Sequence, residues 1–431
     1  MINNGAFERS YQANNLKPAQ LETITFSALA ETDPDECEKL FQACRFDGFF
    51  YLDMRETHDD LLSAIEEIYQ LEHRLFQLPS TELMQYDVDR LSSSKLNGYK
   101  PLGRNRAGLK TGKDGFETYV VSDNVPFQSV SLFATSPTYT VKIPKDGILS
   151  LSRGPWPHPE IIDAYSNALR TFFIATNSAS QVILSALSTS LRIPQSSSNL
   201  QSLHRSADVC TPDMVRLLRY HALATKDTGV SHIAHTDLGS LTFLCTRQWG
   251  LQVQRQRKPP LSSPRVLTKE SEAESWEFVA PPPEGHMIVN LGDMMSMLTG
   301  GILKSCVHRV IPVPGHEEEE RWSFARFVRA EEDVLMKTVN TPLLQRRSPQ
   351  RTRAEHGNEV HESSIDGDFN RRVLCKAEWE RSDHDRQAGD LAGDLMTSGQ
   401  WLQRKFMMLR GETWTKEENW VLRGHKSTPV S

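Results

Sequence analysis

The stretch SHIAHTDLGSLTFL, residues 231–244, decides how the rest of the chain is interpreted. It holds His235 and Asp237 two positions apart, followed by an apolar run with the composition of a strand. On an extended strand, side chains two positions apart lie on the same face. One strand can therefore direct both His235 and Asp237 at a single metal ion.

The His-x-Asp spacing alone is weak support for a metal site. In a chain with fourteen histidines, about one such pair is expected by chance. His58 and Asp60 repeat the spacing, but the aspartates there are typical of a helix start, where carboxylates cap backbone N–H groups. Two histidine–glutamate pairs have the composition of solvated loops, one between prolines and one in an acidic run: His158 with Glu160, and His316 with Glu318.

The segments that follow Asp237 are what distinguish it from these other pairs. They are short, rich in β-branched or aromatic residues and bounded by turn residues: LTFLC, GLQVQ, WEFVA, HMIVNLGD and CVHRVIPV. Their regular recurrence predicts a sandwich or barrel. In such a double-sheet roll, His308 on the last segment can return to the point where His235 and Asp237 meet. Two histidines and one carboxylate are the ligand set of non-haem iron(II) centres that react with oxygen.

The six cysteines give little support for a different metal site. None of them forms a CxxC pair, so a structural zinc site is disfavoured. We interpret them as buried or half-buried thiols in a reducing compartment.

Five motifs of the chain resemble a known family. In order, they are RLLRYH (216–221), HTDLGSLTFL (235–244), GLQVQ (250–254), IVNLGDMMSMLTGGILKSCVHRV (288–310) and RWSFARF (321–327). Together they are similar to the 2-oxoglutarate-dependent, non-haem iron(II) dioxygenases, in the branch that includes isopenicillin N synthase and plant flavonoid and gibberellin oxidases. The resemblance is strongest between about residues 215 and 330. It implies an α+β protein with a double-stranded β-helix (jelly-roll) core flanked by helices.

The same resemblance assigns roles to individual residues. His235, Asp237 and His308 match the iron ligands, and Arg321 and Ser323 match the pair that binds the distal carboxylate of 2-oxoglutarate. Physical chemistry agrees, because a guanidinium binds a carboxylate through two parallel hydrogen bonds and a hydroxyl two residues along a strand shares its face. The alternative is that Arg321 pairs at the surface with Glu317 to Glu320.

Two further residues are matched by the resemblance. Tyr220 matches a tyrosine that adds a phenol hydrogen bond to the same carboxylate, or it is only a half-buried strand aromatic. Phe327 matches an aromatic that packs on substrate, or it belongs to the core.

Two motifs of the chain depart from the family pattern, and the acidic loop GHEEEE lengthens the spacing between His308 and Arg321. Leu218-Arg219-Tyr220 replaces the usual Asn-x-Tyr, which weakens the Tyr220 assignment. Thr299-Gly300-Gly301 replaces Thr-Asn-Gly, a change that a turn tolerates because glycine accepts positive φ as asparagine does.

The implied activity is a 2-oxoglutarate-dependent oxidation. Fe(II), 2-oxoglutarate and O2 would convert a C–H bond of a small organic molecule of secondary metabolism, by hydroxylation or desaturation, with release of succinate and CO2. Two alternatives stay open: an iron oxidase of the same fold that does not consume 2-oxoglutarate, and a non-catalytic binding descendant.

Composition restricts the partners and the location of the protein. The net charge of −6 leaves no broad basic field, so we expect no nucleic-acid partner. No window reaches eighteen consecutive apolar residues and the start MINNGAFERS is polar, so we expect no membrane segment, no signal peptide and a cytoplasmic protein.

The domain organisation is predicted from the remaining pattern. We expect an N-terminal α+β region (1–155), a long helix and linker (156–200), the jelly-roll core (201–334), a mobile polar segment (335–370) and a C-terminal helical extension (371–431). The extension carries Trp401, Trp414 and Trp420 and resembles extensions of fungal relatives. We expect it to fold onto the catalytic core or to form a homodimer.

Overall fold

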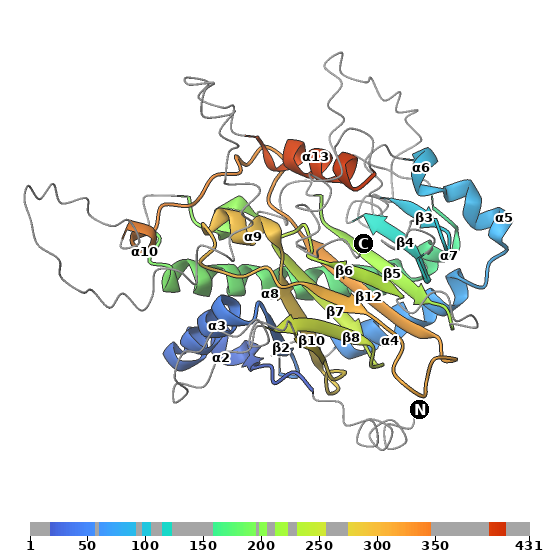
Figure 1. The fold of residues 1–431 in the computed structure, drawn as a ribbon, viewed down its shortest axis with the longest axis horizontal. Coiled ribbons are helices and arrows are strands. Elements are labelled where there is room, and N and C mark those ends of the chain that lie inside the picture. Colours follow the sequence, from blue (N-terminus) through green and yellow to red (C-terminus); the bar gives the residue numbers. More distant parts are fainter. Residues whose placement is uncertain are drawn as a thin grey trace, which may run out of the picture.

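A computed structural model describes residues 18–56, 60–91, 97–104, 114–122, 158–194, 198–204, 212–222, 231–255, 275–345 and 396–410. Two β-sheets and a layer of helices make up these residues (Figure 1). The fold is of the α+β class, as the sequence predicts.

The larger sheet has eight strands, and every pairing except one is antiparallel. In spatial order the strands are β1 (Thr23–Thr25), β2 (Phe49–Asp53), β10 (His286–Leu291), β7 (Leu241–Thr246), β12 (Arg321–Val328), β5 (Met214–Tyr220), β4 (Phe116–Ser122) and β3 (Gly98–Lys100). Only β1 and β2 are parallel. Strands from the N-terminal region therefore extend the sheet at both of its edges.

The smaller sheet has four antiparallel strands, in the order β6 (His232–His235), β11 (His308–Val310), β8 (Leu251–Arg255) and β9 (Ser275–Phe278). From β5 to β12 the chain passes back and forth between the two sheets. This is the double-stranded β-helix that the sequence predicts.

A layer of helices covers the outer face of the larger sheet. The longest helix, α8 (Ser166–Ser190), contacts β12 and also packs against α4 (Leu61–Leu75), α3 (Pro34–Phe46), α2 (Phe26–Ala30) and α7 (Ile161–Ala164) (Figure 1). Phe172 of α8 meets Phe324 of β12 edge-on, with ring centroids 5.2 Å apart. The long helix predicted within residues 156–200 is thus confirmed, and it supports the sheet.

The remaining helices of the described residues are short, apart from the last. They are α5 (Ser80–Leu83), η1 (Met84–Tyr86), α6 (Val88–Leu91), η3 (Gln201–Leu203), α9 (Asp293–Leu298), α10 (Pro342–Gln345) and α13 (Ser398–Arg410). None of the described helices is long and apolar enough to cross a membrane.

The sequence explains where the predicted N-terminal helices begin and end. Helix α3 starts after Asp33, whose carboxylate accepts the Glu36 N–H at 2.9 Å. Helix α4 ends at Leu75, shortly before Pro79, a residue that cannot continue a helix. It starts at the aspartates that follow His58, as predicted, with Asp60 at the N-cap position, but Asp60 makes no side-chain hydrogen bond to the helix. His58 and Asp59 lie outside the described residues.

The strands of the larger sheet separate two apolar cores. On the helix side, Phe324, Leu217 and Tyr119 are adjacent in register and buried. On the other face, residues such as Leu218 and Tyr220 pack with Leu251, Val253 and Val310 of the smaller sheet. The space between the two sheets is therefore lined mainly by apolar side chains, and any polar group that faces it stands out.

The C-terminal helix packs on the core of its own chain. Trp401 and Leu402 of α13 are buried in the main core, and Ser398 Oγ donates a hydrogen bond to Ala330 O at 3.1 Å. Residues before it also reach the core, since Met336 and Val339 are buried. Trp414 and Trp420 lie outside the described residues, as does most of the predicted polar segment, residues 346–370.

Candidate active site

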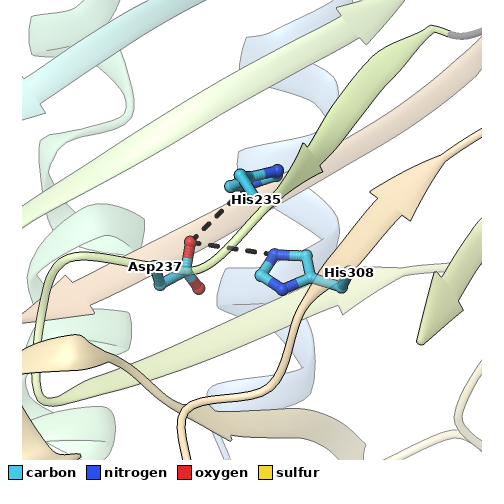
Figure 2. Close-up of side chains that lie close together, drawn as sticks. All are labelled: His235, Asp237 and His308. Carbon is cyan, nitrogen blue, oxygen red and sulfur yellow. Dashed lines mark ion pairs between the residues drawn. The ribbon is translucent and has the colours of Figure 1, made fainter. Parts of the chain in front are cut away.

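Three side chains meet where β6 ends and β11 begins. His235 and His308 are register partners on these two strands, and Asp237 lies in the turn that follows β6. Figure 2 shows the three side chains turned toward one another. Asp237 Oδ1 lies 3.9 Å from His235 Nε2 and 3.8 Å from His308 Nε2. One potential ligand atom of each residue lies within 4.8 Å of the others, so the three residues predicted as iron ligands are brought together.

Backbone carbonyls orient both histidine rings. His235 Nδ1 lies 2.8 Å from Ile233 O, and His308 Nδ1 lies 3.1 Å from Cys306 O. Each Nδ1–H donates to its carbonyl, in the tautomer that leaves Nε2 unprotonated. The two Nε2 lone pairs are thereby presented to the space beside Asp237.

Asp237 uses one oxygen for structure and leaves the other free for a ligand. Thr242 Oγ1 and Asn290 Nδ2 both donate to Oδ2, at 2.7 and 2.8 Å. Burial alone would raise the pKa of Asp237, but His308, His235 and these two hydrogen bonds lower it below its ordinary value. Asp237 is therefore a carboxylate at neutral pH, with Oδ1 directed at the histidines.

The surroundings of His235 favour its neutral form. Burial lowers the pKa of His235, and the nearby His308 lowers it further. His232 stacks on His235 with ring centroids 4.1 Å apart and lies 4.4 Å from the ring of Phe116. Neutral imidazoles beside a carboxylate are what a divalent cation requires of its ligands.

The turn that carries Asp237 is held by the start of α9. The N–H groups of Asp293 and Met294 donate to the carbonyls of Asp237 and Gly239, at 2.7 and 3.2 Å. Gly292 makes this contact possible, because a Cβ there would lie 2.7 Å from Asp237 O and would overlap Gly239 O. The backbone under the carboxylate is thus fixed by a close approach that only glycine allows.

Arg321 presents a fixed guanidinium to the space between the sheets. Its Nε donates to Trp249 O at 3.1 Å, and its two terminal nitrogens donate to Ser323 Oγ and Thr246 Oγ1 at 3.1 and 3.0 Å. Arg321 is only 7% exposed. The alternative of a surface ion pair with the acidic run is therefore wrong, and Glu320 pairs instead with Arg219, at 2.7 Å.

The other predicted site residues lie on the same inner face. The ring of Tyr220 lies 5.0 Å from the guanidinium carbon of Arg321, and Tyr220 is buried. Phe327 is half-buried, six residues along β12 from Arg321 and therefore on the same face of the strand. Gly300 and Gly301 both have positive φ, as the glycine substitution in the family turn predicts.

Three polar residues of the site were not predicted from the sequence: Thr242, Thr246 and Asn290. Thr242 and Thr246 lie on the largely apolar strand β7 and Asn290 lies on the largely apolar strand β10, and no spacing rule marks them. A buried polar residue in a strand otherwise made of core residues is the one signal that could have found them.

The donor set fits iron(II) and a dicarboxylate cosubstrate. Two imidazole nitrogens and one carboxylate oxygen form a facial set for non-haem iron. A buried guanidinium flanked by two hydroxyls on the same inner surface suits a carboxylate. Four described cysteines, Cys37, Cys44, Cys245 and Cys306, are free thiols, and Cys210 and Cys375 lie outside the described residues.

Comparisons with known proteins agree with this chemistry. Residues 212–330 match the model of the 2OG-Fe(II) oxygenase superfamily, and residues 21–132 match that of the non-haem dioxygenase in morphine synthesis N-terminal region. The 2-oxoglutarate-dependent dioxygenase frbH of Dothideomycetidae sp. is 30% identical over 328 residues, covering 76% of this chain and 87% of the relative. The 2-oxoglutarate-dependent dioxygenase gloE of Glarea lozoyensis is 29% identical, covering 79% and 89%.

A solved structure shares the fold. It is that of a full-length Neurospora crassa protein in complex with alpha-KG, with a TM-score of 0.53 and 20% identity over 74% of this chain and 88% of that one. The chain belongs to the 2OG-Fe(II) oxygenase superfamily, and is an oxidoreductase that uses Fe(II), 2-oxoglutarate and O2.

Proposed function

We propose that His235, Asp237 and His308 bind the Fe(II) ion, and that Arg321, Ser323 and Tyr220 bind the distal carboxylate of 2-oxoglutarate. The convergence of two Nε2 atoms on Asp237 Oδ1 carries the proposal, because every other polar atom of these three side chains is already hydrogen-bonded. Metal ligands oriented in this way need no rearrangement of their rings to bind.

Each residue has a defined task in the oxidation. When bound, Fe(II) with 2-oxoglutarate and O2 supplies the oxidising power that removes hydrogen from a C–H bond, with release of succinate and CO2. Arg321 and Ser323 fix one end of 2-oxoglutarate through charge-assisted hydrogen bonds, and Tyr220 adds a phenol beside them. Phe327 contacts the substrate, and the apolar side chains between the sheets keep bulk water away from the reacting atoms.

The substrate is a small organic molecule of secondary metabolism, which is hydroxylated or desaturated. The curated fungal relatives named 2-oxoglutarate-dependent dioxygenases support this substrate class. Both outcomes begin with removal of hydrogen from carbon, so the position of the substrate decides between them.

Three predictions concern the surroundings of the enzyme: a cytoplasmic location, no nucleic-acid partner and a homodimer formed through the C-terminal extension. The packing of Trp401 and Leu402 on the core of the same chain supports a folded extension. Analytical ultracentrifugation at several concentrations would test the dimer.

Product analysis tests the proposed roles. Purified protein with Fe(II) should form succinate in proportion to the O2 consumed, and both should depend on 2-oxoglutarate. Arg321→Ala should mainly raise the concentration of 2-oxoglutarate required, because it removes a charge-assisted contact remote from the metal. Oxygen uptake without dependence on 2-oxoglutarate would instead indicate an oxidase, and equal dependence in Arg321→Ala and wild type would remove Arg321 from the site.

A further inference from the structure

A second arginine, Arg216, faces the space between the two sheets. It lies on β5 two residues before Leu218 and four before Tyr220, on the face of the strand that those residues direct toward the smaller sheet. Its guanidinium carbon lies 5.0 Å from the centre of the Phe327 ring. Its charge also lowers the pKa of His235, so it lies within electrostatic reach of the three proposed iron ligands.

Arg216 differs from its neighbours in having no hydrogen-bonded or ion-paired partner among the described residues. Its Nε is buried without a hydrogen bond, and no hydrogen bond or ion pair joins its guanidinium to any residue in the described parts of the chain. On the opposite face of β5, Arg219 pairs with Glu117 and Glu320. On the neighbouring strand, Arg326 pairs with Asp213 at 2.9 Å. Arg216 is half-buried, and a charged group that is partly removed from water without a paired charge is costly, so proteins keep one where function requires it.

The charges around Arg216 do not compensate it. Burial lowers its pKa, and the negative charge that acts on it is that of Asp237, which the metal site requires. Glu72 lies on the helix side of β5, where its carboxyl accepts the Leu218 N–H at 2.9 Å and burial raises its pKa well above its ordinary value. It is not among the groups that shift the pKa of Arg216. Two other cations lie nearby and do not offset the charge of Arg216. Lys100 is paired with Asp114 at 2.5 Å, and the charge of Arg216 lowers the pKa of Arg329.

With Fe(II) and 2-oxoglutarate bound, the charges of the site sum to one uncompensated positive charge. Asp237 and the two carboxylates of 2-oxoglutarate supply three negative charges, which offset the two charges of Fe(II) and the one of Arg321. The charge of Arg216 remains, and it is close to Phe327, the residue proposed to contact substrate. A single carboxylate would balance it and would satisfy the unbonded guanidinium through two parallel hydrogen bonds.

We propose that Arg216 binds a carboxylate of the substrate, which is therefore a small organic acid whose apolar part packs on Phe327. This rests on the proposed function, because it places the acid beside the iron and 2-oxoglutarate sites. Arg216 fixes which end of the molecule lies away from the metal, and so which carbon is presented to it.

The first test needs no substrate. Arg216→Met removes the charge and keeps most of the apolar stem. In the anaerobic complex with Fe(II) and 2-oxoglutarate, its melting temperature should equal or exceed that of wild type, because the lost group has no partner. The matched control Arg219→Met, on the opposite face of the same strand, should melt lower because it breaks two ion pairs. A melting temperature of Arg216→Met as low as that of Arg219→Met would make Arg216 a structural residue and overturn the proposal.

The second test compares acids with their methyl esters. Aromatic and alicyclic monocarboxylates, from benzoate to naphthoate and cyclohexanecarboxylate, would be titrated calorimetrically into the same complex. We expect the tightest acid to bind roughly 10- to 100-fold more tightly than its ester in wild type and in Arg219→Met, and equally with its ester in Arg216→Met. Equal binding of acid and ester in wild type, a preference that survives in Arg216→Met, or no binding of any acid would refute the assignment.

The visible charge-transfer band of the Fe(II)–2-oxoglutarate complex, recorded on the same samples, shows which claim fails: the role of Arg216 or the proposed function. An intact band without acid preference means that only the role of Arg216 fails. No band in folded wild-type protein means that the proposed function itself fails.

Discussion

At the scale of single residues, the two oxygens of Asp237 have different tasks. Oδ2 is hydrogen-bonded by Thr242 and Asn290, whereas Oδ1 points at both histidines. The carboxylate cannot rotate without breaking two buried hydrogen bonds, so the geometry of the metal site is set before the metal binds. Such supporting contacts commonly matter almost as much as the ligands themselves.

Thr242→Val tests this support with little change of shape. It should lower the affinity for Fe(II) by about 10- to 100-fold while the fold remains intact, because Asp237 loses one of its two fixed hydrogen bonds. Anaerobic calorimetric titration of Fe(II) would measure the change. Thr189→Val, an exposed threonine on α8, is the control and should bind the metal as wild type does. Equal affinity in both variants would show that Thr242 does not orient the carboxylate.

A buried histidine outside the site makes stability depend on pH. His204 is 1% exposed, its nitrogens contact Leu200 O and Ser240 Oγ at 2.6 Å, and burial lowers its pKa below the ordinary 6.5. The unfolded chain therefore binds a proton below pH 6.5 that the folded chain does not, and stability falls as pH falls through this window.

His204→Gln should remove part of that acid sensitivity. Between about pH 7.5 and 5.5 the metal-free variant should lose less free energy of unfolding than wild type, by at most about 1.4 kcal/mol. Urea unfolding at the two pH values measures this difference. Parallel losses in the two proteins would mean that His204 titrates normally in the folded state.

The sequence predicted the ligand residues of the site, but it did not predict the buried threonine and asparagine residues that support them. The motifs that resemble the family predicted a set of five residues, which the structure brings to one inner surface: His235, Asp237, His308, Arg321 and Ser323. Thr242, Thr246 and Asn290 depend on register between strands that are distant in sequence. No local pattern encodes that register, so their contacts emerge only from the fold.

At the scale of elements, the turn after β6 and the start of α9 form one unit. The N–H groups at the start of α9 bind the carbonyls of residues 237–240, and Gly292 allows the two backbones to approach. The position of Asp237 thus depends on a segment more than fifty residues later in the chain. The motif IVNLGD contains Gly292 and Asp293, the residues that make this contact with the turn.

Gly292→Ala should displace the turn that carries Asp237. The added methyl group has no space against the Gly239 carbonyl, so the backbone must shift. We expect at least about a tenfold loss of Fe(II) affinity and a free energy of unfolding lower by roughly 1–3 kcal/mol. Gly399→Ala in α13, whose Cβ would lie 3.3 Å from Glu332 O, is the control and should keep its metal affinity. Wild-type metal affinity in Gly292→Ala would contradict this account of the turn.

The elements themselves were predictable where apolar periodicity was strong. Periodicity and turn residues indicate the segments in which the following elements lie: helices α4 and α8 and strands β7, β8, β10 and β11. The missing side-chain cap at Asp60 and the parallel pair β1 and β2 were not predicted. Both depend on tertiary contacts, which override local preference.

At the scale of the whole molecule, the C-terminal helix completes the core. Trp401 is 3% exposed in the main apolar cluster, so Trp401→Ala should lower the free energy of unfolding by about 3–5 kcal/mol. Urea unfolding measures the loss, and Trp401→Phe should lose less. A loss below about 1 kcal/mol, or one that disappears on dilution, would mean that the helix does not pack on its own chain in solution.

The two sheets and the helix layer serve the same end, which is to hold a small set of polar side chains in an apolar interior. The division of the chain into five regions stays a prediction, although β1 to β4 extend the same sheet as the core strands. The fold could be predicted because its strands recur regularly, whereas the order of strands within each sheet was not predicted, because it depends on pairing between segments that are distant in sequence.

The most direct test of the central claim is an anaerobic titration of Fe(II) into the protein with 2-oxoglutarate, followed by visible absorption. Wild-type protein should develop a weak charge-transfer band that saturates at one iron per chain, and His308→Ala should fold normally without developing it, because one of the three ligands is lost. Folded wild-type protein that gives no band, or a His308→Ala variant that gives the same band, would contradict the account.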